Sequence, residues 1–124
     1  MAEAHFVHED LEGNVAAVLA LRIDPGQTKN AFFSRLAPMI GVEDRDSPRP
    51  ATLDLTQVLE HGSFNSFWTY NGSLTTPPCT EGIRWFVASE PIRLETEQMQ
   101  DILRTSKFSA RVTQQVWQHG INGQ

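Results

Sequence analysis

Runs of apolar and polar residues divide the sequence into short strands and two helices. Residues 4–8 alternate, which predicts a strand with one residue set on each face. A turn follows at residues 10–13. Residues 14–23 are almost wholly apolar and predict a central strand buried on both faces. The residues Asp24-Pro25-Gly26 have strong turn chemistry and are expected to end that strand.

Helical spacing is found in two segments. We predict a helix over residues 28–40, with Gly41 as its C-cap and Pro38 ending its regular part early. The inner side of this helix is formed by Phe32, Phe33, Leu36, Met39 and Ile40. A second helix is predicted over residues 96–104, with Thr96 as its N-cap. Its apolar side is formed by Met99, Ile102 and Leu103.

The remaining segments favour further strands and loops. Residues 67–70 are aromatic and β-branched, and residues 82–88 alternate, so both predict strands. Residues 43–50 are charged and proline-rich, as in a surface loop, whereas residues 51–59 fit a short strand or a turn of helix. The tail over 109–124 looks irregular, with a strand-like piece at 112–117. The pattern predicts one mainly β chain with two peripheral helices and no dividing linker.

Composition narrows the classes of partner. The 124 residues fit one domain at most, and 40% of them are hydrophobic, which is enough for a core. A net charge of -5 argues against a nucleic-acid partner, which would require a basic surface. No segment is apolar for long enough to span a membrane, and the opening residues do not resemble a signal peptide. The single cysteine, Cys79, excludes an internal disulfide and suits a core residue.

The first segment with candidate chemistry is Glu3-Ala-His-Phe-Val-His8. On a strand, Glu3, His5 and Val7 share one face, and His8 lies on the other. The two histidines are therefore not expected to bind one metal together. A carboxylate near a ligand histidine can accept its second N–H and fix the ring. A lone histidine on a strand is equally compatible with a structural role.

The second such segment is Asn71-Gly-Ser-Leu-Thr-Thr-Pro-Pro-Cys79. Pro77 and Pro78 fix the backbone directly after Thr75 and Thr76 and exclude the helical region for Thr76. Hydroxyls held on a rigid loop are preorganised, as catalysis requires. The alternative interpretation is an ordinary turn stiffened by proline.

Together these segments resemble the α-class carbonic anhydrases. The stretch from Tyr70 to Trp85 carries the closest resemblance, and Glu3 to His8 is similar to the family's strand with the third zinc ligand. The resemblance covers nearly the whole chain, most firmly residues 2–23 and 64–104. It implies part of a twisted, mostly antiparallel sheet, a zinc cofactor, and hydration of carbon dioxide to bicarbonate by zinc-bound hydroxide.

The resemblance also implies roles for individual residues. His5 would be the third zinc ligand, and Glu3 would accept the second N–H of its ring. The Thr75 hydroxyl would accept the proton of the zinc-bound hydroxide, and Thr76 would contact bicarbonate or water. An apolar wall around carbon dioxide would be formed by Val7, Val18, Leu74, Ile83 and Trp85.

The sequence departs severely from the family pattern. The family's first two zinc ligands form an upstream His-x-His pattern, and no such pattern occurs here. In that family, the acidic partner of the threonine and the usual proton-shuttle histidine also lie upstream of the matching residues. His61 and His119 are expected to be solvent-exposed and not to replace them. Residues 1–124 thus resemble the C-terminal half of the domain, without two zinc ligands, and little or no activity is expected from this chain alone. The alternative is a non-catalytic binding or oligomerisation module with the same fold.

Two further expectations follow from the resemblance to half a domain. A sheet edge and apolar faces should be exposed, which favours a homodimer or larger assembly. Cys79 occupies a position at which secreted members of the family have a disulfide cysteine. The resemblance therefore hints at a secreted parent protein and leaves Cys79 unpaired in this chain.

Overall fold

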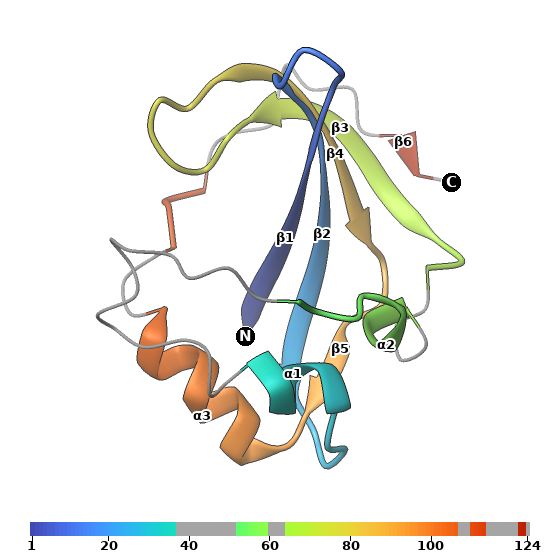
Figure 1. The fold of residues 1–124 in the computed structure, drawn as a ribbon, viewed down its shortest axis with the longest axis vertical. Helices are drawn as coiled ribbons and strands as arrows, with labels where there is room; N and C mark the ends of the chain where they lie inside the picture. Colours follow the sequence, from blue (N-terminus) through green and yellow to red (C-terminus); the bar gives the residue numbers. More distant parts are fainter. Residues whose placement is uncertain (37–51, 60–63, 107–109, 114–121, 124) are drawn as a thin grey trace.

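The structure is a computed structural model that describes residues 1–36, 52–59, 64–106, 110–113 and 122–123. Within these residues the chain forms one six-stranded sheet and three helices (Figure 1). The strands are β1 (Ala2–Glu9), β2 (Val15–Pro25), β3 (Phe67–Ser73), β4 (Glu81–Ala88), β5 (Ile92–Leu94) and β6 (Asn122–Gly123). The helices are α1 (Ala31–Leu36), α2 (Thr56–Leu59) and α3 (Thr96–Thr105).

The sheet is mixed, and β2 is its central strand. The strand order is β1-β2-β4-β3-β6, and β5 pairs with the end of β2. The pairs β1–β2, β3–β4 and β3–β6 are antiparallel, whereas β4 and β5 both run parallel to β2. This arrangement confirms the predicted mainly β fold with peripheral helices. Among the described strands, β1 lies at one edge of the sheet.

The strand register determines which side chains share a face. Val7 pairs with Val18, Val18 with Trp85, and Trp85 with Tyr70, so these four residues form one row across four strands. Because side chains alternate along each strand, residues two positions away lie on the same face. The face that carries His5 therefore includes side chains from β1, β2, β4 and β3.

The opposite face packs against the helices and holds the larger core. Alternation in β1 places Ala4 and Phe6 on this side, as predicted. Burying a large aliphatic or aromatic side chain contributes about 1.5–3 kcal/mol, so this cluster is the main source of stability. Its buried members are Leu21, Ile23, Phe32, Phe33, Val58, Ala88, Ile92, Leu94 and Met99.

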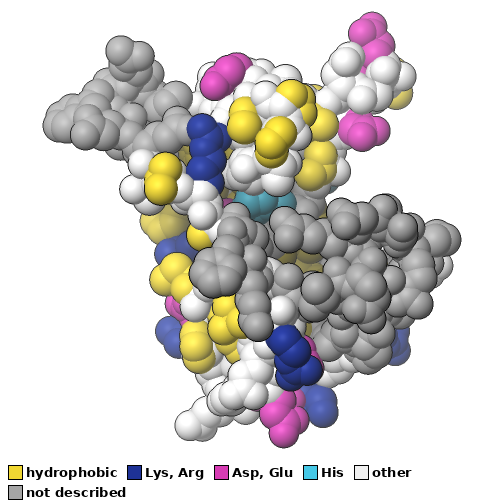
Figure 2. Space-filling model, turned by 90° about the vertical axis from the view of Figure 1, so that its left-hand side faces the viewer, with side chains coloured by type: hydrophobic (Ala, Val, Ile, Leu, Met, Phe, Trp, Pro, Cys, Tyr) yellow, Lys and Arg dark blue, Asp and Glu magenta, His cyan; other side chains and the backbone are white. Residues whose placement is uncertain are grey.

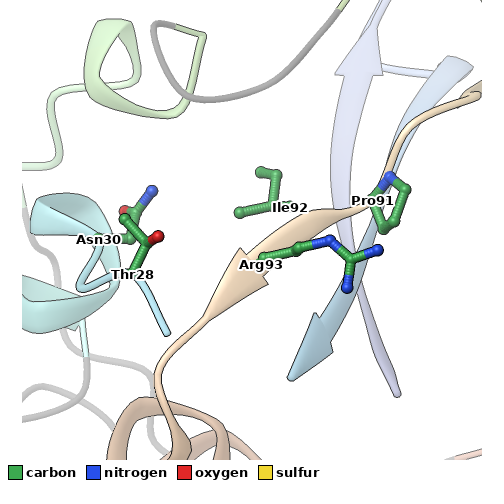
Figure 3. A pocket seen from close by; sticks show the side chains of 5 residues that line it. All are labelled: Thr28, Asn30, Pro91, Ile92 and Arg93. Carbon is green, nitrogen blue, oxygen red and sulfur yellow. The ribbon is translucent and has the colours of Figure 1, made fainter. Parts of the chain in front are cut away.

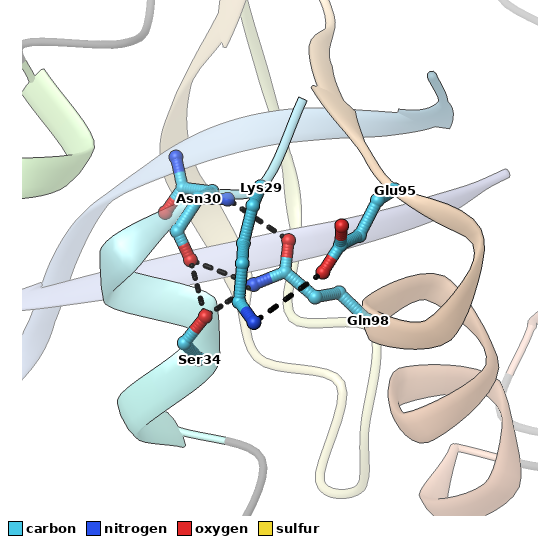
Figure 4. Close-up of polar contacts among 5 residues, drawn as sticks. All are labelled: Lys29, Asn30, Ser34, Glu95 and Gln98. Carbon is cyan, nitrogen blue, oxygen red and sulfur yellow. Dashed lines mark hydrogen bonds and ion pairs between the residues drawn. The ribbon is translucent and has the colours of Figure 1, made fainter. Parts of the chain in front are cut away.

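A buried polar cluster joins α1 to α3 (Figure 4). The Gln98 side-chain amide accepts the Asn30 N–H at 2.9 Å and donates to the Asn30 carbonyl at 2.7 Å. It also donates to the Ser34 hydroxyl at 2.8 Å. At the edge of the cluster, Lys29 lies 3.9 Å from a Glu95 carboxylate oxygen. Such fully paired buried groups fix how the two helices meet.

Both predicted helices form; the second begins at Thr96 as predicted, whereas the first begins three residues later than predicted. The first begins at Ala31, because the Asn30 side chain accepts the Phe33 N–H at 3.2 Å and caps the helix. The prediction of Thr96 as an N-cap was wrong. Glu95 holds that position in an extended conformation and makes no side-chain cap bond, and Thr96 is already helical. The predicted contributions of Pro38, Met39, Ile40 and Gly41 lie outside the described residues.

Other boundaries changed as well. β2 continues through the expected turn to Pro25, because Asp24 and Pro25 pair with β5. Residues 51–59, left open between strand and helix, contain the helical turn α2. β3 extends three residues beyond the predicted 67–70. β5 and β6 were not predicted, since strands of three and two residues leave too little pattern. Of the strand-like tail piece, residues 112 and 113 are not in a strand, and 114–117 lie outside the described residues.

Across the described parts of the chain, no helix is both long and apolar enough to cross a bilayer.

Candidate functional site

The candidate site begins with a short contact between two side chains of β1. His5 Nε2 lies 2.6 Å from Glu3 Oε1, on the face of the strand that both residues share. The His5 side chain is 28% exposed and that of Glu3 is 41% exposed. If Nε2 carries the proton and donates it to the carboxylate, Nδ1 is left with a free lone pair. The pair thus favours the tautomer in which Nδ1 is the nitrogen available to a metal.

One aromatic side chain packs against the His5 ring, and a second packs on the first. The rings of His5 and Trp85 meet edge to face, with centroids 4.8 Å apart and planes at 80°. The Tyr70 ring stacks on the Trp85 ring, nearly parallel to it, with the two centroids 6.0 Å apart. Burial and the nearby Glu3 carboxylate raise the pKa of the Tyr70 hydroxyl, so Tyr70 remains neutral at physiological pH.

The loop between β3 and β4 carries the two threonines. It is closed by hydrogen bonds from the Leu74 N–H to the Thr80 carbonyl and from the Cys79 N–H to the Thr76 carbonyl, each 2.9 Å. The Pro77–Pro78 peptide bond is cis, and Cys79 has a positive φ of 58°. The side chains of Thr75 and Thr76 are exposed. One bond therefore joins the base of the loop and the other closes the turn within it, and both threonines are exposed to solvent.

The predicted apolar wall is only partly enclosed. Val18, Ile83 and Trp85 are buried together, and Leu74 packs on them while remaining half-buried. Val7 is 53% exposed, because β1 is the edge strand among the described residues. Figure 2 shows histidine and hydrophobic surface together on one side of the molecule.

The described residues do not make a complete zinc site. No group of three His, Cys, Asp or Glu side chains able to hold a metal is found among them. His8 Nδ1–H donates to the Phe6 carbonyl at 3.0 Å, since a carbonyl oxygen can only accept. Cys79 is half-buried and has no disulfide. His61 and His119 lie outside the described residues, so the prediction that they are exposed stays a prediction.

A pocket of about 230 Å³ lies elsewhere, between the start of α1 and β5 (Figure 3). It is lined by Thr28, Asn30, Pro91, Ile92 and Arg93. None of the residues predicted for the site borders it. The position of this pocket therefore gives no support to the predicted chemistry, which depends on the sheet face around His5.

Comparison with known proteins identifies the family. The sequence matches the family described as eukaryotic-type carbonic anhydrase over residues 2–119. The chain belongs to that family. It is 34% identical over 115 residues to alpha carbonic anhydrase 3 of Arabidopsis thaliana, covering 85% of this chain and 37% of that protein. It is 36% identical over 101 residues to a carbonic anhydrase of Pectobacterium carotovorum, covering 78% of this chain and 38% of that protein.

Solved structures of other proteins have the same fold. The α-carbonic anhydrase of Thermovibrio ammonificans, solved with the inhibitor sulfanilamide, aligns with a TM-score of 0.80 and 31% identity. The alignment covers 96% of this chain and 52% of that structure. Dioscorin, solved with ascorbate, aligns with a TM-score of 0.76 and 25% identity, covering 98% and 52%. The chain thus spans less than two fifths of the curated relatives above and about half of these solved structures.

The structure brings together most of the residues singled out from the sequence and adds three others. Glu3, His5 and Trp85 are in one cluster of contacts. Tyr70 was not predicted, because only the pairing of β3 with β4 shows that it lies on the face of Trp85. Ala20 and Gly72 were also missed, because small residues leave no periodic signal of their own.

Proposed function

We propose that residues 1–124 are the C-terminal half of an α-carbonic anhydrase domain, which hydrates carbon dioxide to bicarbonate. The observation that carries this proposal is the short Glu3–His5 contact on the same sheet face as the buried wall around Trp85. A carboxylate that orients an imidazole is a common partner of a metal ligand. Membership of the carbonic anhydrase family supplies the reaction.

His5 is proposed as one zinc ligand, binding through Nδ1, with Glu3 holding its ring. Catalytic zinc normally has three protein ligands, which the described residues do not supply. We therefore propose that this chain alone has little or no activity. The exposed hydroxyls of Thr75 and Thr76 would contact bicarbonate or water. Val7, Val18, Leu74, Ile83 and Trp85 would form the apolar wall, which suits a substrate without a net dipole.

Carbon dioxide hydration and bound zinc, both measured on the purified 124-residue chain, test this proposal. We expect no stoichiometric zinc and a rate equal to that of buffer. The His5→Ala and His8→Ala variants form a matched pair, because only His5 faces the wall. Activity with stoichiometric zinc, lost in His5→Ala but kept in His8→Ala, would contradict the predicted inactivity while supporting the role of His5. Equal loss in both variants would contradict that role.

The fold also supports a second candidate, a non-catalytic binding module. Dioscorin, a protein of the same fold at 25% identity, was solved with ascorbate. A titration of the zinc-free chain with ascorbate, followed by NMR, would test this candidate. Saturable shifts at the Thr75 and Thr76 amides would support it, and their absence at millimolar ascorbate would count against it.

We further propose that the chain forms homo-oligomers through the edge strand β1. Within the described sheet no strand pairs with the outer side of β1, and Val7, on β1, is 53% exposed. Unpaired edges and exposed apolar groups recruit other chains. Light scattering should show an assembly that Val7→Lys weakens. Leu103→Lys should leave it intact, because Leu103, wrongly predicted on the inner side of α3, is 45% exposed. A stable wild-type monomer at micromolar concentration would exclude it.

A further inference from the structure

We propose that Trp85 is a positioning residue that holds the His5 ring and the Thr75–Thr76 loop in one fixed arrangement. The importance of Trp85 for catalysis rests on the function proposed above. Its contacts with His5 and with Ser73 do not depend on that function. The role differs from that of a wall residue, because a wall needs only bulk, whereas this role needs a ring face and one N–H group. Three sets of contacts support it.

The first contact orients the imidazole. The edge-to-face packing of His5 and Trp85 at 4.8 Å is a preferred aromatic geometry, contributing about 0.5–1.5 kcal/mol beyond burial. Ala20 pairs directly with His5 on β2 and is fully buried. Its single methyl group leaves the space through which the indole, one row away, reaches the His5 ring. Glu3 then fixes the ring through Nε2, and Trp85 limits its rotation.

The second contact anchors the loop. The Trp85 Nε1–H donates to the Ser73 carbonyl at 3.1 Å. Ser73 is the last residue of β3 and directly precedes Leu74 and Thr75. The register between β3 and β4 shifts between Gly72 and Ser73, so the regular ladder is already disturbed there. The indole bond thus holds the chain at the point where the loop departs from the sheet.

The third set of contacts holds the indole itself. Trp85 is only 3% exposed, and Tyr70 stacks on it. At Gly72, an added Cβ would lie 2.9 Å from Tyr70 Cε2 and 3.4 Å from Trp85 Cδ1. Glycine is therefore the residue that lets these two rings pack against the backbone of β3. A side chain so tightly enclosed can transmit position between the groups that it touches.

Two substitutions separate the two contacts. Trp85→Phe keeps an aromatic ring against His5 but removes the N–H to Ser73, whereas Trp85→Leu removes both. Trp68→Phe is the matched control, because Trp68 lies on β3, is 41% exposed, and packs under Arg22 at 5.1 Å. All three can be compared as zinc-free chains, so the experiment requires neither metal nor turnover.

Amide hydrogen exchange at Leu74 and Cys79 measures how often the loop opens, because the N–H groups of these residues close it. Loss of one hydrogen bond worth about 1 kcal/mol corresponds to about fivefold faster opening. We expect this increase in Trp85→Phe, relative to the β1–β2 ladder, and no increase in Trp68→Phe. Exchange that rises equally in the loop and in the ladder would overturn the link, because it would show a general loss of stability.

The ¹⁵N chemical shifts of the two ring nitrogens report the tautomer of His5, since they differ widely when one tautomer dominates. We expect their separation to be kept in Trp85→Phe and to fall in Trp85→Leu, where the ring is free to rotate. Gly72→Ala, which crowds the same rings, should also reduce it if Trp85→Leu does not fold. An unchanged separation in Trp85→Leu, or in Gly72→Ala where that replaces it, would overturn the positioning of His5. Neither result depends on carbon dioxide hydration, so the proposed function and this inference can fail separately.

Discussion

Replacing Gln98 by methionine tests whether the buried polar cluster stabilises the packing of α3 on α1. Gln98 is 5% exposed, and its amide makes hydrogen bonds of 2.9, 2.7 and 2.8 Å with Asn30 and Ser34. Methionine has a similar length and volume, so the change removes the polar groups and leaves little cavity.

The magnitude follows from the three bonds. Each contributes about 1 kcal/mol net, which gives a loss of about 3 kcal/mol. The buried Asn30 N–H would lose the Gln98 acceptor, and an unpaired buried donor costs about 1–3 kcal/mol in its own right. The two estimates describe the same loss and agree. With a urea slope of about 2 kcal/mol per molar, the unfolding midpoint should fall by about 1.5 M.

Urea unfolding followed by tryptophan fluorescence measures this change. Gln100→Met is the matched control, because Gln100 lies on the exposed side of the same helix. A surface substitution of this kind should change stability by no more than about 0.5 kcal/mol. Equal stabilities for Gln98→Met and Gln100→Met would refute the argument that the cluster joins the helices.

Three other predictions concern separate parts of the fold. The N–H groups of Asn14 and Glu12 lower the pKa of Asp10, so the stability that Asp10 contributes is present above its ordinary pKa of 3.8 and is lost as pH falls below it. The stability difference between wild type and Asp10→Asn, measured by urea unfolding, should therefore shrink below pH 3.8. Gly26→Ala should destabilise by about 1–3 kcal/mol, because a Cβ there would lie 2.7 Å from the Arg93 Cβ. Ile83→Ala should cost about 2–5 kcal/mol, since Ile83 is buried in the wall; thermal unfolding measures both.

The long strands could be predicted because the pattern of apolar and polar residues along them matches the burial of each position. Strict alternation in β1 assigned each of its faces correctly, and the apolar run of β2 identified the central strand. Short elements could not be predicted, because β5 and β6 exist only through pairing with distant strands. The N-cap of α3 was misplaced for a related reason. A threonine is a good cap in isolation, but the chain enters from β5, and Glu95 is tied to Thr28 by its backbone N–H.

The candidate site could be predicted as a set of residues but not as a geometry. Motif resemblance brought His5 and the Thr75 loop together, although 70 positions separate them in the sequence. It could not show that β2 lies between β1 and β4, with parallel pairing on one side. The contacts of Trp85 with His5 and Ser73 depend on that arrangement. They also depend on the small residue Ala20, which no periodicity marks as important.

Alternate residues of β2 face the helix-side core, which stabilises the fold, and the His5 side, which positions the imidazole ring. Two adjacent residues test whether these roles are separate. Leu21 belongs to the helix-side core, whereas Ala20 is buried on the face of His5 and Trp85. Leu21→Ala should therefore cost about 2–5 kcal/mol and leave the ¹⁵N shifts of His5 unchanged. Ala20→Val adds two methyl groups beside the His5 ring, and should displace it at a cost of about 1–3 kcal/mol. If Leu21→Ala disturbs the His5 signals as much as Ala20→Val does, the two faces are coupled and the ring is not held by local contacts.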